Sequence, residues 1–174
     1  MKKLIFVFTT VFAIAFANTL NAQNGKTKDI VDIAVSVDDF STLVTALKAA
    51  NLVDALKGEG PFTVFAPTNS AFAKIDSKTL NALLEPKNRE TLSKILTYHV
   101  ISGKYEANDV VKALKKGGGA IVLKTLSGDK VKIKQRNGGI YLKDQKGNYS
   151  KIVKTDVIGT NGVIHIIDTV VMPN

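Results

Sequence analysis

Apolar residues follow two different spacings along the chain. Between residues 29 and 116 they recur mostly every three or four positions, which is typical of helices with one buried face. From residue 120 onward they alternate with polar residues or form short runs bounded by Gly and Asn, which is typical of strands. Because most helices precede the strands instead of alternating with them, the pattern predicts an α+β fold rather than a βαβ succession.

The same pattern gives approximate bounds for each element. We expect helices over residues 29–34, 40–47, 52–56, 69–74 and 79–84, one that begins at 87 or 88 and runs to 96, and one that begins at 107 or 108 and runs to 114 and is ended by the glycines at 117–119. We expect strands over residues 62–65, 98–101, 121–126, 130–136, 140–143, 149–157 and 163–171. Asp38 or Asp39 is the expected N-cap of the second helix, and Ser77 is that of the fifth.

The first residues have the features of a secretory signal peptide. Lys2 and Lys3 precede an apolar run over residues 4–17, and residues 20–22 resemble a cleavage box. A membrane anchor is the alternative, but the run is shorter than the ~20 residues that a spanning helix needs. We therefore expect a cleaved signal peptide at 1–22, a flexible lead-in at 23–28 and one domain at 29–173. The protein is then secreted or periplasmic, with no transmembrane segment after cleavage.

Composition narrows the chemistry that this domain can use. The chain contains no Cys, which excludes disulfides and thiol catalysis. Its formal net charge of +9 becomes +7 when Lys2 and Lys3 are removed with the signal peptide. A basic exported protein favours polyanionic neighbours such as acidic polysaccharides, lipid headgroups or acidic proteins. The alternative is that the charge serves solubility alone.

Residues 62–72 combine a strand, a turn and a helix start. Phe62 to Phe65 is a run of aromatic and β-branched residues, which suits a buried strand. Pro67 favours extended geometry at Ala66, and the three polar residues at 68–70 are candidate helix N-caps. No nucleophile, metal cluster or phosphate loop accompanies this segment, so we interpret it as structural.

Three motifs resemble the signatures of fasciclin-like domains: residues 63–72, the pair Tyr98-His99, and residues 159–168. The similarity covers residues 29–173, and it includes Thr63, Val64, Phe65, Ala66, Pro67, Thr68, Asn69, Asn161, Gly162, His165 and Asp168. The resemblance implies a compact wedge, a twisted β-sandwich with helices packed at one side, and a non-enzymatic role in adhesion. In animal members the tyrosine–histidine pair is linked to integrins. The chain is more similar to small secreted bacterial members, and bacteria have no integrins, so that partner does not transfer.

Tyr98 and His99 are candidate binding residues because they combine an aromatic ring with a titratable one. On the strand expected there, successive side chains point to opposite faces, so one of the two should point inward. We expect His99 to be partly buried and hydrogen-bonded to Thr68 or Asn69, because buried polar groups need partners. The structural interpretation of the pair is favoured over the functional one.

The sequence offers no catalytic or metal-binding constellation. His165 and Asp168 lie three positions apart on an expected strand and should face opposite sides, which disfavours a hydrolase. The two histidines are separated by 66 positions and the chain has no Cys, so no zinc site of ordinary spacing is present. We predict no metal and no cofactor.

The best candidate binding surface lies on the strand expected at 130–136. Alternation directs Val131 and Ile133 toward the core and places four cations on the opposite face, namely Lys130, Lys132, Lys134 and Arg136. Tyr141 and Lys143 extend this row across the hairpin expected at 137–139. Such a row fits a polyanion, with Tyr141 stacking on a sugar ring. The alternative is that the lysines protect a sheet edge from aggregation.

Two functions follow from these observations. The first is an exported, non-enzymatic binding or adhesion module that contacts a cell-surface protein, matrix or anionic polysaccharide. Export makes nucleic acid a poorer candidate. The second is an envelope protein that binds or transforms a lipid or hydrophobic metabolite, which requires an enclosed pocket of ~300 Å³ or more between helices and sheet. The sequence does not specify the oligomeric state.

Overall fold

A computed structural model describes residues 28–174. The signal peptide predicted at 1–22 and most of the lead-in lie outside the described residues. No helix within residues 28–174 is long and apolar enough to cross a membrane.

Helices and strands occur in the predicted order, which confirms the α+β class. The helices are α1 (Ile30–Val35), α2 (Ser41–Ala49), α3 (Val53–Lys57), α4 (Asn69–Phe72), α5 (Ser77–Leu84), α6 (Arg89–Tyr98) and α7 (Ala107–Lys116). The strands are β1 (Phe62–Pro67), β2 (Val100–Ser102), β3 (Ala120–Lys124), β4 (Lys130–Arg136), β5 (Gly139–Lys143), β6 (Tyr149–Gly159) and β7 (Gly162–Ile167). Short 3₁₀ turns lie at Asp38–Phe40 and Pro86–Asn88.

All seven strands belong to one sheet in the order β2-β1-β7-β6-β5-β4-β3. Within residues 28–174, β1 and β7 are the only parallel neighbours. The long strand β6 pairs with β5 through its first residues and with β7 along the rest, and register shifts around Lys154 bend it between the two partners. The two layers of the sandwich that the resemblance implies are therefore halves of a single curled sheet. The curl nearly closes, because Leu126 N donates to Val100 O at 2.8 Å.

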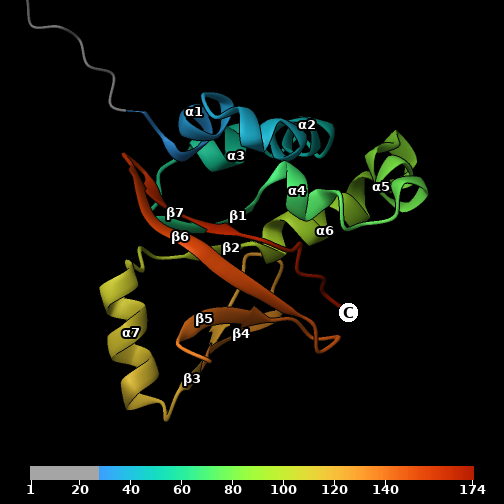
Figure 1. The fold of residues 1–174 in the computed structure, drawn as a ribbon. Coiled ribbons are helices and arrows are strands. Elements are labelled where there is room, and N and C mark those ends of the chain that lie inside the picture. The colour runs from blue at the N-terminus through green and yellow to red at the C-terminus, as the bar shows by residue number, and fades with distance from the viewer. Residues whose placement is uncertain (1–27) are drawn as a thin grey trace, which may run out of the picture.

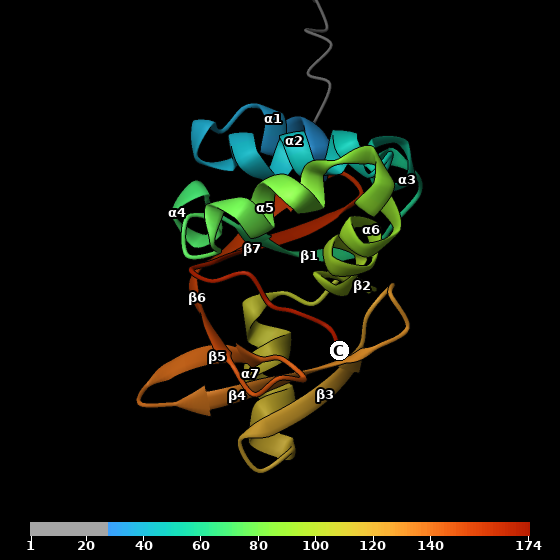
Figure 2. The same cartoon turned by 90° about the vertical axis from the view of Figure 1, so that its right-hand side faces the viewer.

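The helices are unevenly distributed over this sheet (Figures 1 and 2). Helices α1 to α6 lie together above β1, β2 and β7, whereas α7 stands apart beside the half formed by β3, β4 and β5. One apolar cluster fills the space under the first group and contains Phe40, Leu47 and Leu92. A second cluster lies between the two halves of the sheet and α7, and contains Ile133 and Leu142. Among the described residues, 28–174, no layer covers the outer face of β3 to β6.

The segment after β1 ties the helices together. Thr68 caps α4 by accepting from Ala71 N, and Asn69 Oδ1 accepts from Thr42 N at 2.9 Å, near the start of α2. Asn69 Nδ2 donates to Asp38 O at 3.0 Å and to Ser41 Oγ at 2.9 Å. The prediction that Asp38 or Asp39 caps α2 is therefore wrong, because these two residues form a 3₁₀ turn and Asn69 satisfies the backbone from a distance.

Other boundaries also differ from the sequence prediction: the strand expected at 163–171 ends at Ile167, and the one expected at 121–126 ends at Lys124. Tyr98 is the last residue of α6 and His99 is its C-cap, with φ −84° and ψ −1°, so the strand expected at 98–101 begins only at Val100. The apolar spacing of α6 explains this, since Leu92, Ile95 and His99 lie on one helical face and all are buried. At α5 the N-cap is Asp76, whose carboxylate accepts from Thr79 N at 3.0 Å, rather than Ser77.

Replacing Asn69 tests this long-range cap. Asn69→Ala removes three hydrogen bonds and leaves Thr42 N without its partner, so we expect the free energy of unfolding to fall by about 2 kcal/mol. Urea denaturation followed by circular dichroism measures the change. The matched control is Asn108→Ala, at an exposed Asn on α7. Equal destabilisation by the two variants would contradict the assignment.

Candidate binding face

The outer face of β3 to β6 carries a concentration of cations, which we call the basic face. Strand alternation buries Val131 and Ile133 while the residues between them point outward, as the sequence predicts. The neighbouring strands add further cations and two tyrosines to the same face. The basic face comprises Lys124 of β3; Lys130, Lys132, Lys134 and Arg136 of β4; Tyr141 and Lys143 of β5; and Tyr149 and Lys151 of β6.

Strand register arranges these side chains as a grid. Lys132 lies opposite Val122 on one side and Lys143 on the other. In the next row Lys134 lies opposite Tyr141, and Tyr141 in turn lies opposite Lys151. Neighbouring strands are ~4.8 Å apart and same-face residues of one strand ~6.8 Å apart, so the cations form a two-dimensional array instead of a single row.

Tyr149 lies at the centre of an aromatic and cationic cluster. The Arg136 guanidinium carbon lies 5.1 Å from the centre of its ring, and Lys143 Nζ lies 5.5 Å from it. The ring of Tyr141 meets it edge-on, with a centroid distance of 6.4 Å and an interplanar angle of 83°. These contacts hold the two cations near the sheet surface and pre-organise this part of the face.

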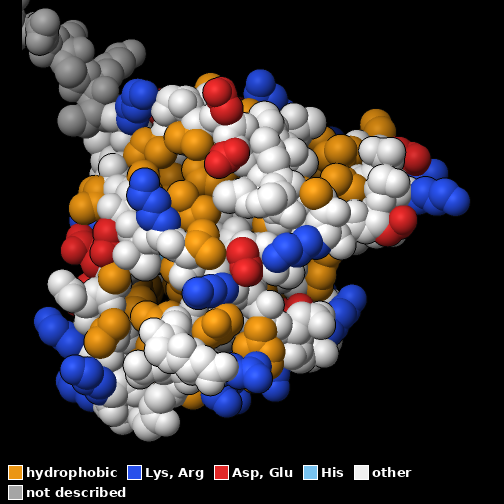
Figure 3. All heavy atoms as spheres, in the orientation of Figure 1, with side chains coloured by type: hydrophobic (Ala, Val, Ile, Leu, Met, Phe, Trp, Pro, Cys, Tyr) orange, Lys and Arg blue, Asp and Glu red, His pale blue; other side chains and the backbone are white. Residues whose placement is uncertain are grey.

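The positive charge of the basic face is not neutralised locally. Among the residues that the structure describes, none of its seven cations has a carboxylate oxygen within 4.0 Å. Residues 120–154 contain nine Lys and Arg residues but only Asp129 and Asp144. Asp144 is buried and accepts from Asn148 N at 2.7 Å, and Asp129 faces Lys94 at 3.7 Å. Lys and Arg side chains are seen along the lower half of the molecule in Figure 3.

Register also places like charges directly opposite each other. Lys124 is paired with Lys130, and Lys132 with Lys143. Such cross-strand pairs are destabilising. Protection of a sheet edge does not account for Lys130, Lys132 and Lys143, because β4 and β5 are interior strands. The array therefore costs stability.

Tyr98 and His99 lie in the core and away from the basic face. The Tyr98 hydroxyl donates to Lys130 O at 3.1 Å, and burial raises its pKa to about 12. His99 Nδ1 donates to Ile95 O at 2.8 Å, and its Nε2 accepts from Val171 N at 3.2 Å. The partners predicted for His99, Thr68 or Asn69, are therefore wrong. Tyr98 joins α6 to the start of β4, and His99 joins α6 to the C-terminal segment.

His165 and Asp168 also have separate structural partners. The His165 ring is buried, with Nε2 donating to Tyr105 O at 2.8 Å, and burial lowers its pKa. The Asp168 carboxylate accepts from Lys151 N at 2.9 Å. The structure does not bring this pair together. Within residues 28–174 no three His, Cys, Asp or Glu side chains are grouped as a metal site.

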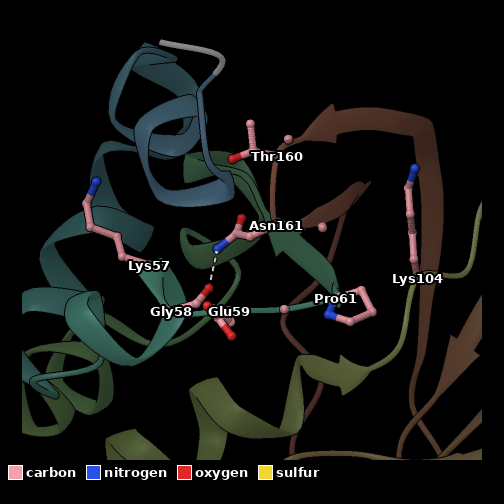
Figure 4. Close-up of a pocket in the computed structure, with 10 residues that line it drawn as sticks. Lys57, Gly58, Glu59, Pro61, Lys104, Thr160 and Asn161 are labelled. Atoms are coloured by element: carbon pink, nitrogen blue, oxygen red, sulfur yellow. Dashed lines mark hydrogen bonds between the residues drawn. The ribbon is translucent and has the colours of Figure 1, made fainter.

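A hollow beside the helices is shaped by glycines (Figure 4). It has a volume of about 530 Å³ and lies between Lys57 and Lys104, which extend on opposite sides of it. Asn161 Nδ2 donates to Gly58 O at 3.0 Å, and a Cβ at Gly60 would lie 1.9 Å from Asn161 O. Lys57 is held by two carboxylates, including Asp29 at 3.1 Å. Close packing of the backbone around Gly58 and Gly60 therefore explains the shape of this hollow.

The apolar space between helices and sheet is too small for a metabolite. The cavity bounded by Ile30, Leu47, Phe65 and His99 measures about 30 Å³, whereas ligand pockets start near ~300 Å³. This observation weighs against the second function considered from the sequence.

Comparison with known proteins identifies the family. Residues 38–173 match the sequence profile of the Fasciclin domain. The chain belongs to this family. Two proteins of Synechocystis sp. are similar to this fasciclin domain. One, sll1483, is 44% identical, over 83% of this chain and 73% of its own length, and the other, sll1735, is 40% identical, over 83% of this chain and 97% of its own. A solved FAS1 domain pair from the insect cell adhesion molecule fasciclin I superposes with a TM-score of 0.73 at 20% identity, over 83% of this chain and 51% of that one.

Sequence reasoning missed Lys124, Tyr149 and Lys151. Alternation along residues 149–157 shows that Tyr149 and Lys151 share a face, but only the β5–β6 register shows that this is the face of Tyr141. The missing information was strand pairing, to which no local motif in the sequence corresponds.

His99 makes the fasciclin domain sensitive to acid. Burial lowers its pKa from 6.5 to about 4, so the unfolded chain binds a proton at higher pH than the folded domain does. We expect the free energy of unfolding to decrease as pH falls from about 6.5 to about 4, by about 1.4 kcal/mol per pH unit from this group. Urea denaturation across that range should show a shallower slope for His99→Gln. An NMR titration that gave His99 an ordinary pKa would contradict this prediction.

Proposed function

We propose that this fasciclin domain is an exported, non-enzymatic binding module that attaches to anionic polysaccharide at a cell surface or matrix through the basic face. The observation that supports this most strongly is the uncompensated cation array on a bare, rigid sheet. The family relationship is consistent with it, since the insect relative of the same fold is a cell adhesion molecule.

The chemistry of the face favours an acidic sugar polymer over other polyanions. Cations in several rows can follow a flexible anionic chain, while Tyr141 and Tyr149 offer ring surfaces on which a sugar can stack. A surface made only for electrostatic attraction to lipid headgroups has no need for the tyrosines. Nucleic acid is not the expected partner of an exported protein.

The proposal includes no catalysis because the candidate catalytic side chains already have structural partners. Both histidines are buried, and each hydrogen-bonds backbone groups through both ring nitrogens. Neither histidine ring has a nitrogen free to bind a substrate. The large open hollow near Asn161 is lined mainly by backbone and by side chains that already have partners.

Charge reversal on the central strand tests the proposal. We expect Lys132→Glu combined with Lys134→Glu to lower the affinity for an immobilised acidic polysaccharide at least about 30-fold, since each cation near an anionic surface contributes ~1 kcal/mol. Wild-type binding should weaken steeply as salt rises, because exposed charges are screened. Biolayer interferometry over a salt series measures both effects.

The control carries the same change in net charge on the helical side. Lys48→Glu combined with Lys78→Glu alters two exposed lysines of α2 and α5 and should leave the affinity within about 3-fold of wild type. Equal losses in the two double variants would show that net charge, and not the basic face, governs binding. No binding by the wild-type domain to acidic glycans or to whole cells would reject the proposed function.

A further inference from the structure

The bare side of the sheet contains a hollow whose wall is rich in lysine. It has a volume of about 320 Å³ and lies over β4 and β5, next to the turn that joins β5 to β6. That volume is at the lower end of the range for small-ligand sites, ~300–1,000 Å³, so the hollow fits one substituted sugar unit rather than a length of polymer. We call it the lysine hollow, after the four lysines that line it: Lys130 and Lys132 of β4, Lys143 of β5, and Lys146 of the turn.

The charge of the lysine hollow is not balanced by its own walls. Among the residues that the structure describes, none of the four lysines has a carboxylate oxygen within 4.0 Å. Asp144 is the only acid in the lining. Its carboxylate accepts from Asn148 N at 2.7 Å, from Asn148 Nδ2 at 3.1 Å and from Met172 N at 3.3 Å. Four lysines and one aspartate with other partners leave the hollow strongly positive.

The turn that carries Lys146 has a fixed geometry. Asp144 N donates to Asn148 O at 3.0 Å, and Gly147 N donates to Asp144 O at 3.2 Å. Gly147 has φ +92°, in the left-handed region that glycine adopts without strain. Together with the bonds to the Asp144 carboxylate, these contacts fix the backbone of Lys146 relative to β5. A ligand that contacts Lys146 therefore does not have to order a loop first, which lowers the entropic cost of binding.

Two of the lysines are opposed in the sheet, and a bound anion would relieve that opposition. Lys132 lies directly opposite Lys143 in the ladder between β4 and β5, where Cβ atoms are ~4.5–5.5 Å apart and like charges are destabilising. An anion between the two ammonium groups replaces one repulsion by two attractions. On its other side Lys132 lies opposite Val122, which is 52% exposed and lines the same hollow. Val122 offers an apolar wall for the carbon skeleton of a sugar.

We propose that the lysine hollow binds a sulfate or phosphate ester on a sugar unit of the polysaccharide, in preference to a sugar carboxylate. This inference rests on the proposed function and names the anion that the basic face selects. A planar carboxylate is matched best by the planar fork of Arg, whereas the ammonium group of Lys acts as a point charge. The lining contains no Arg. Point charges from two strands and a turn suit an ester anion, whose three terminal oxygens point in different directions.

Three small ligands that differ in the anion test this preference on the hollow alone. The mature protein is titrated with a hexose 6-sulfate, a hexose 6-phosphate and a hexuronate at one ionic strength, and binding is followed by NMR. At least one ester should bind about 10-fold more tightly than the hexuronate, and the tighter of the two identifies the ester. A hexuronate that binds as tightly as both esters, or more tightly, would overturn the proposal.

Lys146 allows a substitution in the hollow that leaves the basic face, as defined above, unchanged. Lys146→Gln should lower the affinity for the preferred ester about 5-fold, since one cation near an anion contributes ~1 kcal/mol. Lys78→Gln is the matched control, because it removes the same charge from an exposed lysine on α5, and it should stay within about 2-fold of wild type. Equal affinities of the two variants for the ester would contradict a site at the hollow.

Polymers separate the failure of this inference from that of the proposed function. Ester-bearing and carboxylate-bearing polysaccharides with the same charge per sugar are compared by biolayer interferometry. Wild type should bind the ester-bearing polymers more tightly, and Lys146→Gln should reduce this difference. Equal binding to both kinds of polymer would leave the proposed function standing and reject the ester preference. Binding to neither would reject the proposed function, and the role of the lysine hollow with it.

Discussion

The strands β3 to β6 are packed on one face and bare on the other, and this asymmetry determines the charge pattern of the molecule. A strand exposes every second residue, so the apolar residues that fill the inner layer require that the residues between them face solvent. Ile133 is fully buried between Lys132 and Lys134 for this reason. A face that is uncovered, rigid and built from a regular ladder can present cations at fixed spacings, which flexible loops cannot do.

The tyrosine–histidine pair and the closing signature serve that rigidity. Tyr98 reaches from the end of α6 to the first residue of β4, and His99 bonds the C-terminal segment through Val171 N. His165 connects β7 to the backbone of Tyr105. These buried polar contacts link the helical layer to both halves of the sheet, so the signature residues help to hold the basic face in shape. Their burial and their hydrogen bonds to backbone groups give these residues structural partners.

Much of the fold could be predicted from the sequence, and the limits of the prediction have identifiable causes. Alternation over residues 130–136 and the Asn137-Gly138 turn specify β4, its exposed face and its hairpin with β5, because both are local properties. The cap of α2 could not be predicted from the local sequence, since the side chain that accepts from Thr42 N belongs to Asn69, 27 positions away. The role of Tyr149 and the single continuous sheet depend on pairing between distant strands. Likewise the hydrogen-bond partners of Tyr98 and His99 are set by tertiary packing.

Direct observation of the lysine ammonium groups tests the central claim, that one face of the sheet is the contact surface. An NMR titration of the lysine Nζ resonances with a short acidic oligosaccharide would report each cation separately. The account predicts that the resonances of Lys130, Lys132, Lys134, Lys143 and Lys151 shift together, while those of Lys48, Lys78 and Lys104 remain unchanged. Shifts concentrated at Lys57 and Lys104, around the hollow lined by glycines, would contradict it.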